Sequence, residues 1–311
     1  MASPRIPVTL VTGFLGAGKS TLLARVLLDA NPRRIAVIEN DLADVGVDQR
    51  LLAGGEGRVV ALAGGCVCCS ARGDLLGAVR QVCSVAAPPD AIVIETSGIA
   101  RPSATAADLI ELGASERQVW LRAIVAVVDA ANAINDSGRV EFIDQVVHAD
   151  VVLLTKDDLV DTNALRDARR VVREINPAAV IGRAAQAGAS DVLGPAGDRV
   201  ESAFVEVAGF HALGHDIDAI SVELPSSLDG ERLRAVLSDL ASDPSVIRVK
   251  GFVKVGHEVQ LVQGVHGIVD TLPWPSVSSD ALALVIIGER LDAGELRHRL
   301  QGCAATSEAD N

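Results

Sequence analysis

The chain has 311 residues, of which 49% are hydrophobic and only 2% aromatic, and its formal net charge is −13 at pH 7. A chain this acidic and this poor in aromatic side chains lacks the basic surface and stacking platforms that nucleic-acid binding requires. No uninterrupted apolar stretch reaches the roughly 18 residues of a membrane span, and the first residues lack the pattern of a signal peptide. We therefore expect a cytoplasmic protein that binds neither nucleic acid nor membrane.

The first 200 residues alternate short β-branched runs with helical patterns. Continuous apolar runs of strand length are typical of strands buried on both faces, as in a parallel sheet. The alternation of strands and helices predicts a doubly wound, mostly parallel α/β domain over residues 1–200. The predicted strands are IPVTLV (6–11), RIAVIE (34–39), AIVIE (91–95), AIVAVV (123–128) and DVVLLT (150–155).

The pattern changes after about residue 200. Strands that follow one another closely and alternate in hydrophobicity, such as VIRVKGFVKV and EVQLVQGV, indicate antiparallel pairing. Together with a helical pattern at DGERLRAVLSDLA, they predict a second, smaller α+β domain over 217–303. The polar residues 304–311 are expected to form a disordered tail.

A glycine-rich sequence, GFLGAGKST, follows the first predicted strand and precedes a helical pattern. This is G-x-x-x-x-G-K-[ST] in the context that a phosphate-binding loop requires, and it predicts a P-loop NTPase. Lys19 is expected to reach the β- and γ-phosphates, and the Ser20 hydroxyl to hold Mg²⁺. An ordinary glycine turn is the alternative. The predicted phosphate-site residues are Gly13, Gly16, Ala17, Gly18, Lys19, Ser20 and Thr21.

A second nucleotide element, TKDD, ends the strand predicted at 150–155. It is similar to the N/T-K-x-D sequence of GTP-binding P-loop proteins, in which the Asp accepts two hydrogen bonds from guanine and the Lys stem packs across the base. Thr155, Lys156 and Asp158 are thus the predicted guanine-binding residues, with a charged loop at a strand end as the alternative.

The strand predicted at 91–95 ends in Glu95, followed by Thr96, Ser97 and Gly98. A carboxylate at the C-terminal end of a buried parallel strand, beside a phosphate loop, is placed to act with Mg²⁺. We therefore predict Glu95 as a Mg²⁺ and catalytic residue together with Lys19, and Gly98 as an N–H donor to the γ-phosphate. The alternative is that Glu95 caps the next helix.

Three of the five cysteines, Cys66, Cys68 and Cys69, lie within four positions after two glycines. In a reducing compartment, clustered cysteines favour metal binding or redox chemistry over structural disulfides. Three thiolates would leave one position of a tetrahedral ion open, which suits a carrier. Sulfur ligands favour Zn²⁺ and accept Co²⁺. A redox pair and simple packing remain the alternatives.

These motifs together resemble the CobW-type GTPases, relatives of the nickel-insertion GTPases. The resemblance rests on GFLGAGKST, ENDLADVGVD (39–48), GGCVCC (64–69), ETSGIARP (95–102), VVDA (127–130), TKDDLV (155–160), and on RVKGFV, Trp274 and LVIIGERLD in the second domain. It implies a GTP-dependent metallochaperone whose second domain binds a client protein.

The chain departs from that family in three places, one of which is Arg101, where many members have Asp. The family usually has N-E-F-G in the switch segment, where this chain has NDLA, so a metal role carried over to Asp41 is weakly supported. The family's His-rich segment is reduced to His211 and His215, which favour a solvated linker over an accessory metal site.

The sequence therefore predicts an enzyme that hydrolyses GTP to GDP and phosphate and delivers Zn²⁺, or Co²⁺, to a client metalloprotein. Three alternatives stay open: a cobalt or iron insertion factor, a metal buffer or sensor with a structural nucleotide, and an ATP-using P-loop kinase. A homo-oligomer is compatible with the sequence.

Overall fold

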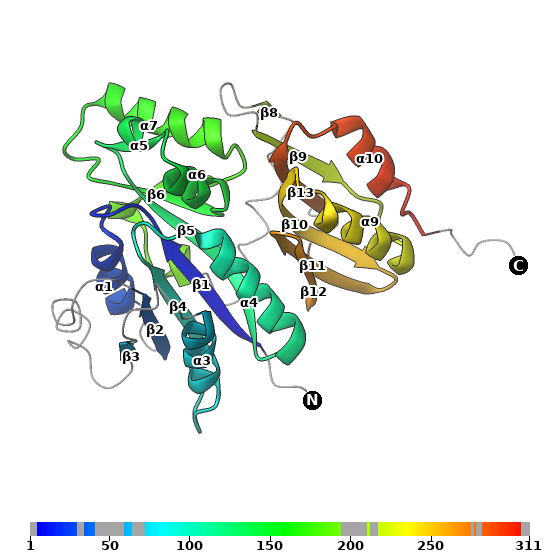
Figure 1. Ribbon diagram of the computed structural model, residues 1–311, viewed down its shortest axis with the longest axis horizontal. Coiled ribbons are helices and arrows are strands. Elements are labelled where there is room, and N and C mark those ends of the chain that lie inside the picture. Colours follow the sequence, from blue (N-terminus) through cyan, green and yellow to red (C-terminus); the bar gives the residue numbers. More distant parts are fainter. Residues whose placement is uncertain are drawn as a thin grey trace, which may run out of the picture. The chain divides into compact units, whose positions relative to one another are not determined.

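The chain divides into two compact units in the computed structural model (Figure 1). One unit comprises Met1–Val172 and Ala179–Gly197, and the other comprises Arg173–Ala178 and Asp198–Asn311. The structure describes residues 5–29, 34–40, 59–63, 72–193, 210–211, 217–274, 277 and 282–305.

The first unit is built on a seven-stranded sheet in the order β3-β2-β4-β1-β5-β6-β7. Every neighbouring pair of these strands is parallel. All six residues of β4 are buried, as expected for a strand covered on both faces. The strands are β1 Ile6–Thr12, β2 Ile35–Asn40, β3 Val59–Ala63, β4 Ala91–Thr96, β5 Val119–Asp129, β6 Val151–Thr155 and β7 Val180–Arg183.

Helices cover both faces of this sheet. α1 and α8 contact each other and share a core with Val11, Val93 and Val125, whereas α4 contacts α3, α6, β1 and β5. Because side chains alternate along a strand, the buried Leu10 faces away from Val11. The prediction of a doubly wound parallel α/β unit is confirmed. The helices are α1 Lys19–Asp29, α3 Arg72–Cys83, α4 Pro102–Glu116, α5 Ala133–Asp136, α6 Val140–Val147, α7 Thr162–Ile175 and α8 Ala189–Leu193, with a 3-10 turn η1 at Ala184–Gln186.

The second unit contains a six-stranded antiparallel sheet in the order β12-β11-β10-β13-β9-β8. Its hydrophobic core joins Ile220, Val253 and Ile286 of the sheet to leucines of α9 and α10. The predicted smaller α+β unit is therefore confirmed. The elements are β8 Phe210–His211, β9 Ile217–Glu223, α9 Gly230–Ser242, β10 Val246–Val255, β11 Glu258–Val265, β12 Ile268–Trp274, β13 Ala283–Glu289 and α10 Ala293–Gln301.

Helices α9 and α10 of the second unit each begin after an aspartate that caps them. Asp229 accepts hydrogen bonds from the N–H groups of Glu231 and Arg232 at 2.9 and 3.0 Å, and Asp292 accepts from those of Gly294 and Glu295 at 2.8 and 3.0 Å. Such caps satisfy N–H groups that have no partner within the helix.

The C-terminal boundary differs from the expected one at two residues. Ala304 forms a bridge with Leu228, and the Ala305 N–H donates to the Ser227 carbonyl at 3.1 Å. Both residues were expected in the disordered tail because residues 304–311 form a mostly polar segment. Backbone pairing with the Leu228 segment, which is distant in sequence, holds them instead. Residues 306–311 lie outside the described part of the chain.

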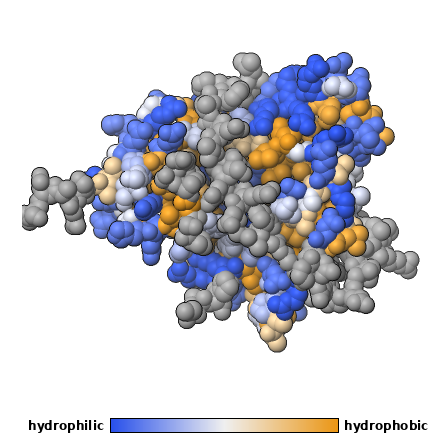
Figure 2. Space-filling view, turned by 180° about the vertical axis from the view of Figure 1, so that it is seen from behind, coloured by the Kyte–Doolittle hydropathy of each residue, from blue (hydrophilic) through white to orange (hydrophobic). Residues whose placement is uncertain are grey.

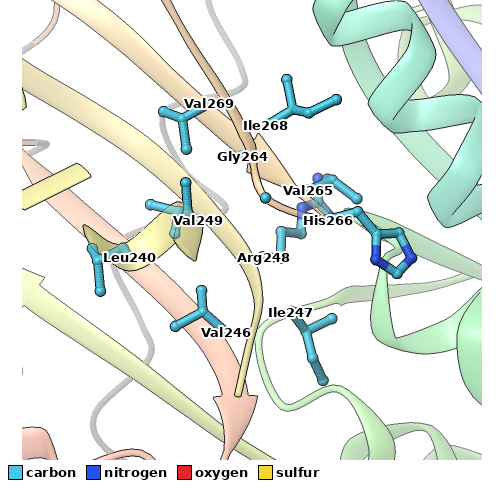
Figure 3. Close-up of a pocket in the computed structure, with 12 residues that line it drawn as sticks. Leu240, Val246, Ile247, Arg248, Val249, Gly264, Val265, His266, Ile268 and Val269 are labelled. Atoms are coloured by element: carbon cyan, nitrogen blue, oxygen red, sulfur yellow. The ribbon is translucent and has the colours of Figure 1, made fainter. Parts of the chain in front are cut away.

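The second unit has a small, partly open hollow between α9 and the β10–β12 region (Figure 3). Leu240, Val246, Val249 and Val269 line it, and the His266 ring lies at one edge of the group. Ligand pockets usually enclose about 300–1,000 Å³ and carry convergent polar groups. The hollow is smaller than that and mostly apolar, so we place the chemistry in the first unit.

The surface mixes hydrophilic and hydrophobic side chains on the face shown in Figure 2. Scattered exposed apolar residues are normal in a chain with this many hydrophobic residues. Within the described ranges, no helix combines the length and the apolar character needed to span a bilayer.

Candidate functional site

The glycine-rich loop leads from β1 into α1 at the carboxyl edge of the parallel sheet. A Cβ at Gly13 would collide with the carbonyl oxygen of Val127, so the close approach of loop to β5 requires glycine there. The Lys19 side chain is buried, and its Nζ donates to the Gly13 carbonyl at 2.9 Å and lies 3.5 Å from that of Phe14. The ammonium thus sits within the loop, beside the N-terminus of α1, where anions bind.

The structure brings Ser20 and Glu95 together. The Ser20 hydroxyl donates to Glu95 Oε1 at 3.1 Å, and Glu95, at the end of β4, is 5% exposed. Hydroxyl and carboxylate oxygens are hard donors of the kind that Mg²⁺ prefers. These two side chains therefore fit a magnesium ion. Helix α4 begins after Arg101, and the carboxylate that accepts from its first turn is that of Asp144, to which the Ser103 N–H donates at 3.3 Å.

The loop after β4 packs directly on the phosphate loop. A Cβ on Gly98 would lie 2.7 Å from the backbone nitrogen of Leu15 and 2.8 Å from its Cα, closer than real Cβ contacts allow. Gln145 of α6, which is buried, fixes this loop by donating from Nε2 to the Gly98 and Ala100 carbonyls at 3.1 and 3.2 Å. Gly98 is thus held against the phosphate site from two sides.

The tight contact at Gly98 gives a stability prediction. Gly98→Ala is expected to lower the free energy of unfolding by about 1–3 kcal/mol, because the backbone of one of the two loops must shift to admit the methyl group. The measurement is the urea midpoint of nucleotide-free protein. Gly77→Ala in α3 is the matched control, since a Cβ there meets nothing within 4 Å and alanine favours a helix by roughly 0.5–1 kcal/mol. Equal midpoints for the two variants would contradict the packing argument.

The TKDD segment is hydrogen-bonded to the phosphate loop. The Thr155 hydroxyl donates to the Ala17 carbonyl at 2.7 Å and lies 3.3 Å from that of Val128. Thr155 therefore links β6 to the phosphate loop, although its side chain is shorter than the asparagine more common at this position. Thr21 is exposed on the first turn of α1, and Ala17 is buried.

The two aspartates of TKDD have different environments. Asp157 is buried and forms an ion pair with Arg183 of β7, whereas Asp158 is exposed. An aspartate already paired with arginine has little capacity left for a ligand. Asp158, the residue that the motif assigns to guanine, is the one free of that pair.

Lys156 is held by Asp129, a residue that the motif analysis did not assign to the site. Lys156 Nζ donates to Asp129 Oδ2 at 2.7 Å, and the Asp129 carboxylate also accepts from Asn132 Nδ2 at 2.8 Å and the Ala131 N–H at 2.9 Å. Burial pushes the pKa of Asp129 upward, but the hydrogen bonds from Lys156, Asn132 and Ala131 outweigh it and lower the pKa from its ordinary value.

Several predicted site residues lie outside the described part of the chain. They are Asp41, Cys66, Cys68, Cys69 and His215, and of His211 only the backbone is described, in β8. The other two cysteines are described: Cys83 is half-buried on α3 and Cys303 is buried after α10. The pKa of both thiols is raised, and burial is the largest cause at each of them.

Comparison with known proteins covers both units. Residues 7–182 match the model of the CobW/HypB/UreG nucleotide-binding domain, and residues 217–304 match that of the cobalamin synthesis protein CobW C-terminal domain. The chain is 30% identical to the zinc chaperone CobW of Pseudomonas aeruginosa over 97% of this chain and 92% of that protein. It is 29% identical to the zinc chaperone CobW of a Sinorhizobium species over 91% and 93% of the two chains.

A solved structure with the same fold is the Zn(II)-bound YjiA GTPase from Escherichia coli, with a TM-score of 0.63 and 25% identity over 97% of this chain and 100% of that one. The nucleotide-binding model alone covers more than half of the chain, and the loop that it includes has the geometry described above. The chain therefore belongs to the CobW family of P-loop GTPases.

Proposed function

We propose that this GTPase binds Zn²⁺ through Cys66, Cys68 and Cys69 and passes the ion to a client protein in a cycle controlled by its nucleotide. Relatives that are named zinc chaperones and share about 30% of the sequence over most of the chain support zinc as the cargo. The thiols are soft ligands that suit Zn²⁺ and Co²⁺, and three of them leave a coordination position through which an ion can be handed on.

The observation that carries this proposal is the register of three neighbouring strands. Ala63, the last residue of β3, lies opposite Glu39 of β2, which lies opposite Glu95 of β4. Adjacent strands are about 4.8 Å apart, so the backbones at Ala63 and Glu95 are roughly 10 Å apart at the same sheet edge. Ala63 lies three residues before Cys66, so the chain enters the cysteine segment at the sheet edge that carries Glu95, with β2 between the two strands.

The described residues support a division of tasks at the nucleotide. We assign the phosphates to Lys19 and the loop N–H groups, and guanine to Thr155, Lys156 and Asp158. Ser20 and Glu95 would hold Mg²⁺, which neutralises charge that develops on the phosphates during transfer. Gly98, held by Gln145, would donate its N–H to the γ-phosphate, so that this loop differs between GTP and GDP states.

We assign client binding to the second unit, residues 217–303. None of the proposed nucleotide or zinc ligands lies there, and its described elements form a core of their own. The second unit therefore offers a surface that carries none of the proposed nucleotide or zinc ligands.

The test is the Zn²⁺ affinity of the purified protein in two nucleotide states, measured by competition with a chromophoric chelator. With Mg²⁺ and a non-hydrolysable GTP analogue, we expect Zn²⁺ to bind roughly 5- to 150-fold more tightly than with Mg²⁺ and GDP, the usual range of coupling between two sites. Parallel titrations with Co²⁺ rank the two metals.

Linkage supplies an internal control. If the GTP analogue tightens Zn²⁺ binding by a given factor relative to GDP, Zn²⁺ must raise the ratio of GTP-analogue affinity to GDP affinity by the same factor. Equal Zn²⁺ affinities in the GTP and GDP states would rule out the proposed coupling, because a ligand that binds two states equally does not shift the equilibrium between them. A zinc-buffering protein with a structural nucleotide would give that result.

A further inference from the structure

The end of β5 and the start of the TKDD loop are joined by an ion pair at the sheet edge. Asp129 and Thr155 are register partners in the parallel strands β5 and β6, so Lys156 follows directly beside the Asp129 carboxylate. The side chain of Asp129 is 10% exposed and that of Lys156 is 39% exposed, and their charged atoms are 2.7 Å apart. The ion pair is therefore partly buried, and the Asp129 carboxylate is the more buried of its two groups.

Asp129 is itself immobilised by its own turn. Oδ1 accepts from the Ala131 N–H, and Oδ2 accepts from Asn132 Nδ2 in addition to Lys156. Donors from three residues therefore surround one carboxylate. An asparagine could not replace it without conflict, because an amide has only one acceptor oxygen and would turn its NH₂ group toward a donor.

The backbone of Lys156 adopts a conformation that lysine rarely takes. Its φ is 54°, in the left-handed region, and the Leu159 N–H donates to its carbonyl at 3.1 Å. A non-glycine residue stays in that region when its surroundings hold it there. The ion pair with Asp129 links this turn to the end of β5, the strand next to β6.

We propose that Asp129 is a positioning residue for nucleotide recognition: it anchors the Lys156 ammonium so that the lysine stem forms a fixed apolar shelf for the purine base beside Asp158. The inference rests on the proposed guanine site and adds a residue to it. A lysine stem that is already ordered loses less conformational freedom when the base binds, so anchoring raises affinity without adding a contact to the ligand. Asp158 discriminates between bases, whereas the shelf stabilises any purine.

The test is a double-mutant cycle on GDP affinity, measured by calorimetry without zinc. Asp129→Asn is expected to weaken GDP binding roughly 5- to 20-fold and inosine diphosphate binding by the same factor, since the shelf does not contact the 2-amino group. Lys156→Met keeps an apolar stem but removes the ammonium. In that background, Asp129→Asn should change GDP affinity less than about twofold, because the partner it anchors is gone.

Two controls separate positioning from general stability. Asp239→Asn removes an exposed carboxylate from an ion pair of the same 2.7 Å length, with Arg299 in the second unit, and should leave GDP affinity unchanged. The Asp129→Asn variant should also raise the KM for GTP while kcat stays near normal, as expected when uniform binding is lost.

The outcomes that overturn the proposal are distinct from those that overturn the guanine site or zinc delivery. Asp129 does not act through Lys156 if Asp129→Asn weakens GDP binding equally in the wild type and in the Lys156→Met variant. The same conclusion follows if it weakens GDP binding in neither of them. If the wild-type chain binds ADP as tightly as GDP, the guanine assignment fails, while the cycle still reports whether the shelf exists. Zinc delivery plays no part in the measurement.

Discussion

Asp158→Ala is expected to weaken GTP and GDP binding by roughly 10²- to 10⁴-fold while leaving ATP binding as weak as in the wild type. The carboxylate can accept two hydrogen bonds from guanine N1 and N2, and each hydrogen bond to a charged group contributes about 1.5–3 kcal/mol. Adenine has no matching pair of donors, so the loss falls on guanine nucleotides alone. Titration calorimetry with GDP and ADP measures both affinities.

Asp167→Ala is the matched control for charge, because Asp167 is an exposed carboxylate on α7 that pairs with Arg170. It should change neither affinity by more than about twofold, as surface ion pairs contribute little. If the chain binds ATP tightly and Asp158→Ala does not change its nucleotide affinities, the protein is the ATP-using kinase. The phosphate loop alone does not exclude that alternative. The same variant thus decides base specificity and that alternative together.

The fold could be predicted from the sequence because its signals are local. Runs such as AIVIE are apolar at every position, and a strand buried on both faces needs that pattern. The glycines of GFLGAGKST are a local signal for the phosphate loop. Gly13 is needed because the backbone there approaches β5 so closely that a Cβ would collide with Val127. Antiparallel strands in the second unit were visible for the same reason, since β10 and β11 follow one another closely.

The parts of the site that motifs did not assign depend on contacts between distant segments. Asp129 and Lys156 are 27 residues apart, Asp157 and Arg183 are 26 apart, and Gln145 reaches the Gly98 carbonyl across 47 residues. No spacing rule links such pairs. One signal was available: VVDA and TKDD both end predicted parallel strands, and the carboxyl ends of such strands share an edge. The strand order that makes them neighbours is a property of the folded sheet.

The register of β3, β2 and β4 also supports the proposed coupling between the thiol segment and the nucleotide. β2 ends at Asn40, immediately before the segment that includes Asp41, and β3 ends at Ala63, immediately before the glycines and cysteines. Both strands end at the sheet edge where Glu95 meets Ser20. A change at the γ-phosphate therefore has a short path to both segments, which is what the proposed coupling requires.

Replacing Cys66, Cys68 or Cys69 singly with serine is expected to weaken Zn²⁺ binding by more than about 10²-fold. Even groups that only orient a metal ligand cost 10- to 100-fold when removed, so the loss of a ligand atom should cost more. Serine is nearly the size of cysteine, but its hydroxyl does not deprotonate near neutral pH as a thiol can. Chelator competition gives the Zn²⁺ affinity, and the thiolate charge-transfer band of bound Co²⁺ reports the sulfur ligands directly.

Cys83→Ser and Cys303→Ser are the matched controls, because burial raises the pKa of both thiols and keeps them protonated at neutral pH. Cys303 also donates its S–H to the Arg299 carbonyl at 3.4 Å, a contact that a serine hydroxyl can replace. Both controls should bind Zn²⁺ as the wild type does, and all five variants should keep normal GDP affinity without metal, because none of the proposed nucleotide contacts is a cysteine. If the three variants at 66, 68 and 69 all retain the wild-type cobalt spectrum, these cysteines are not the ligands, and zinc delivery through them is excluded.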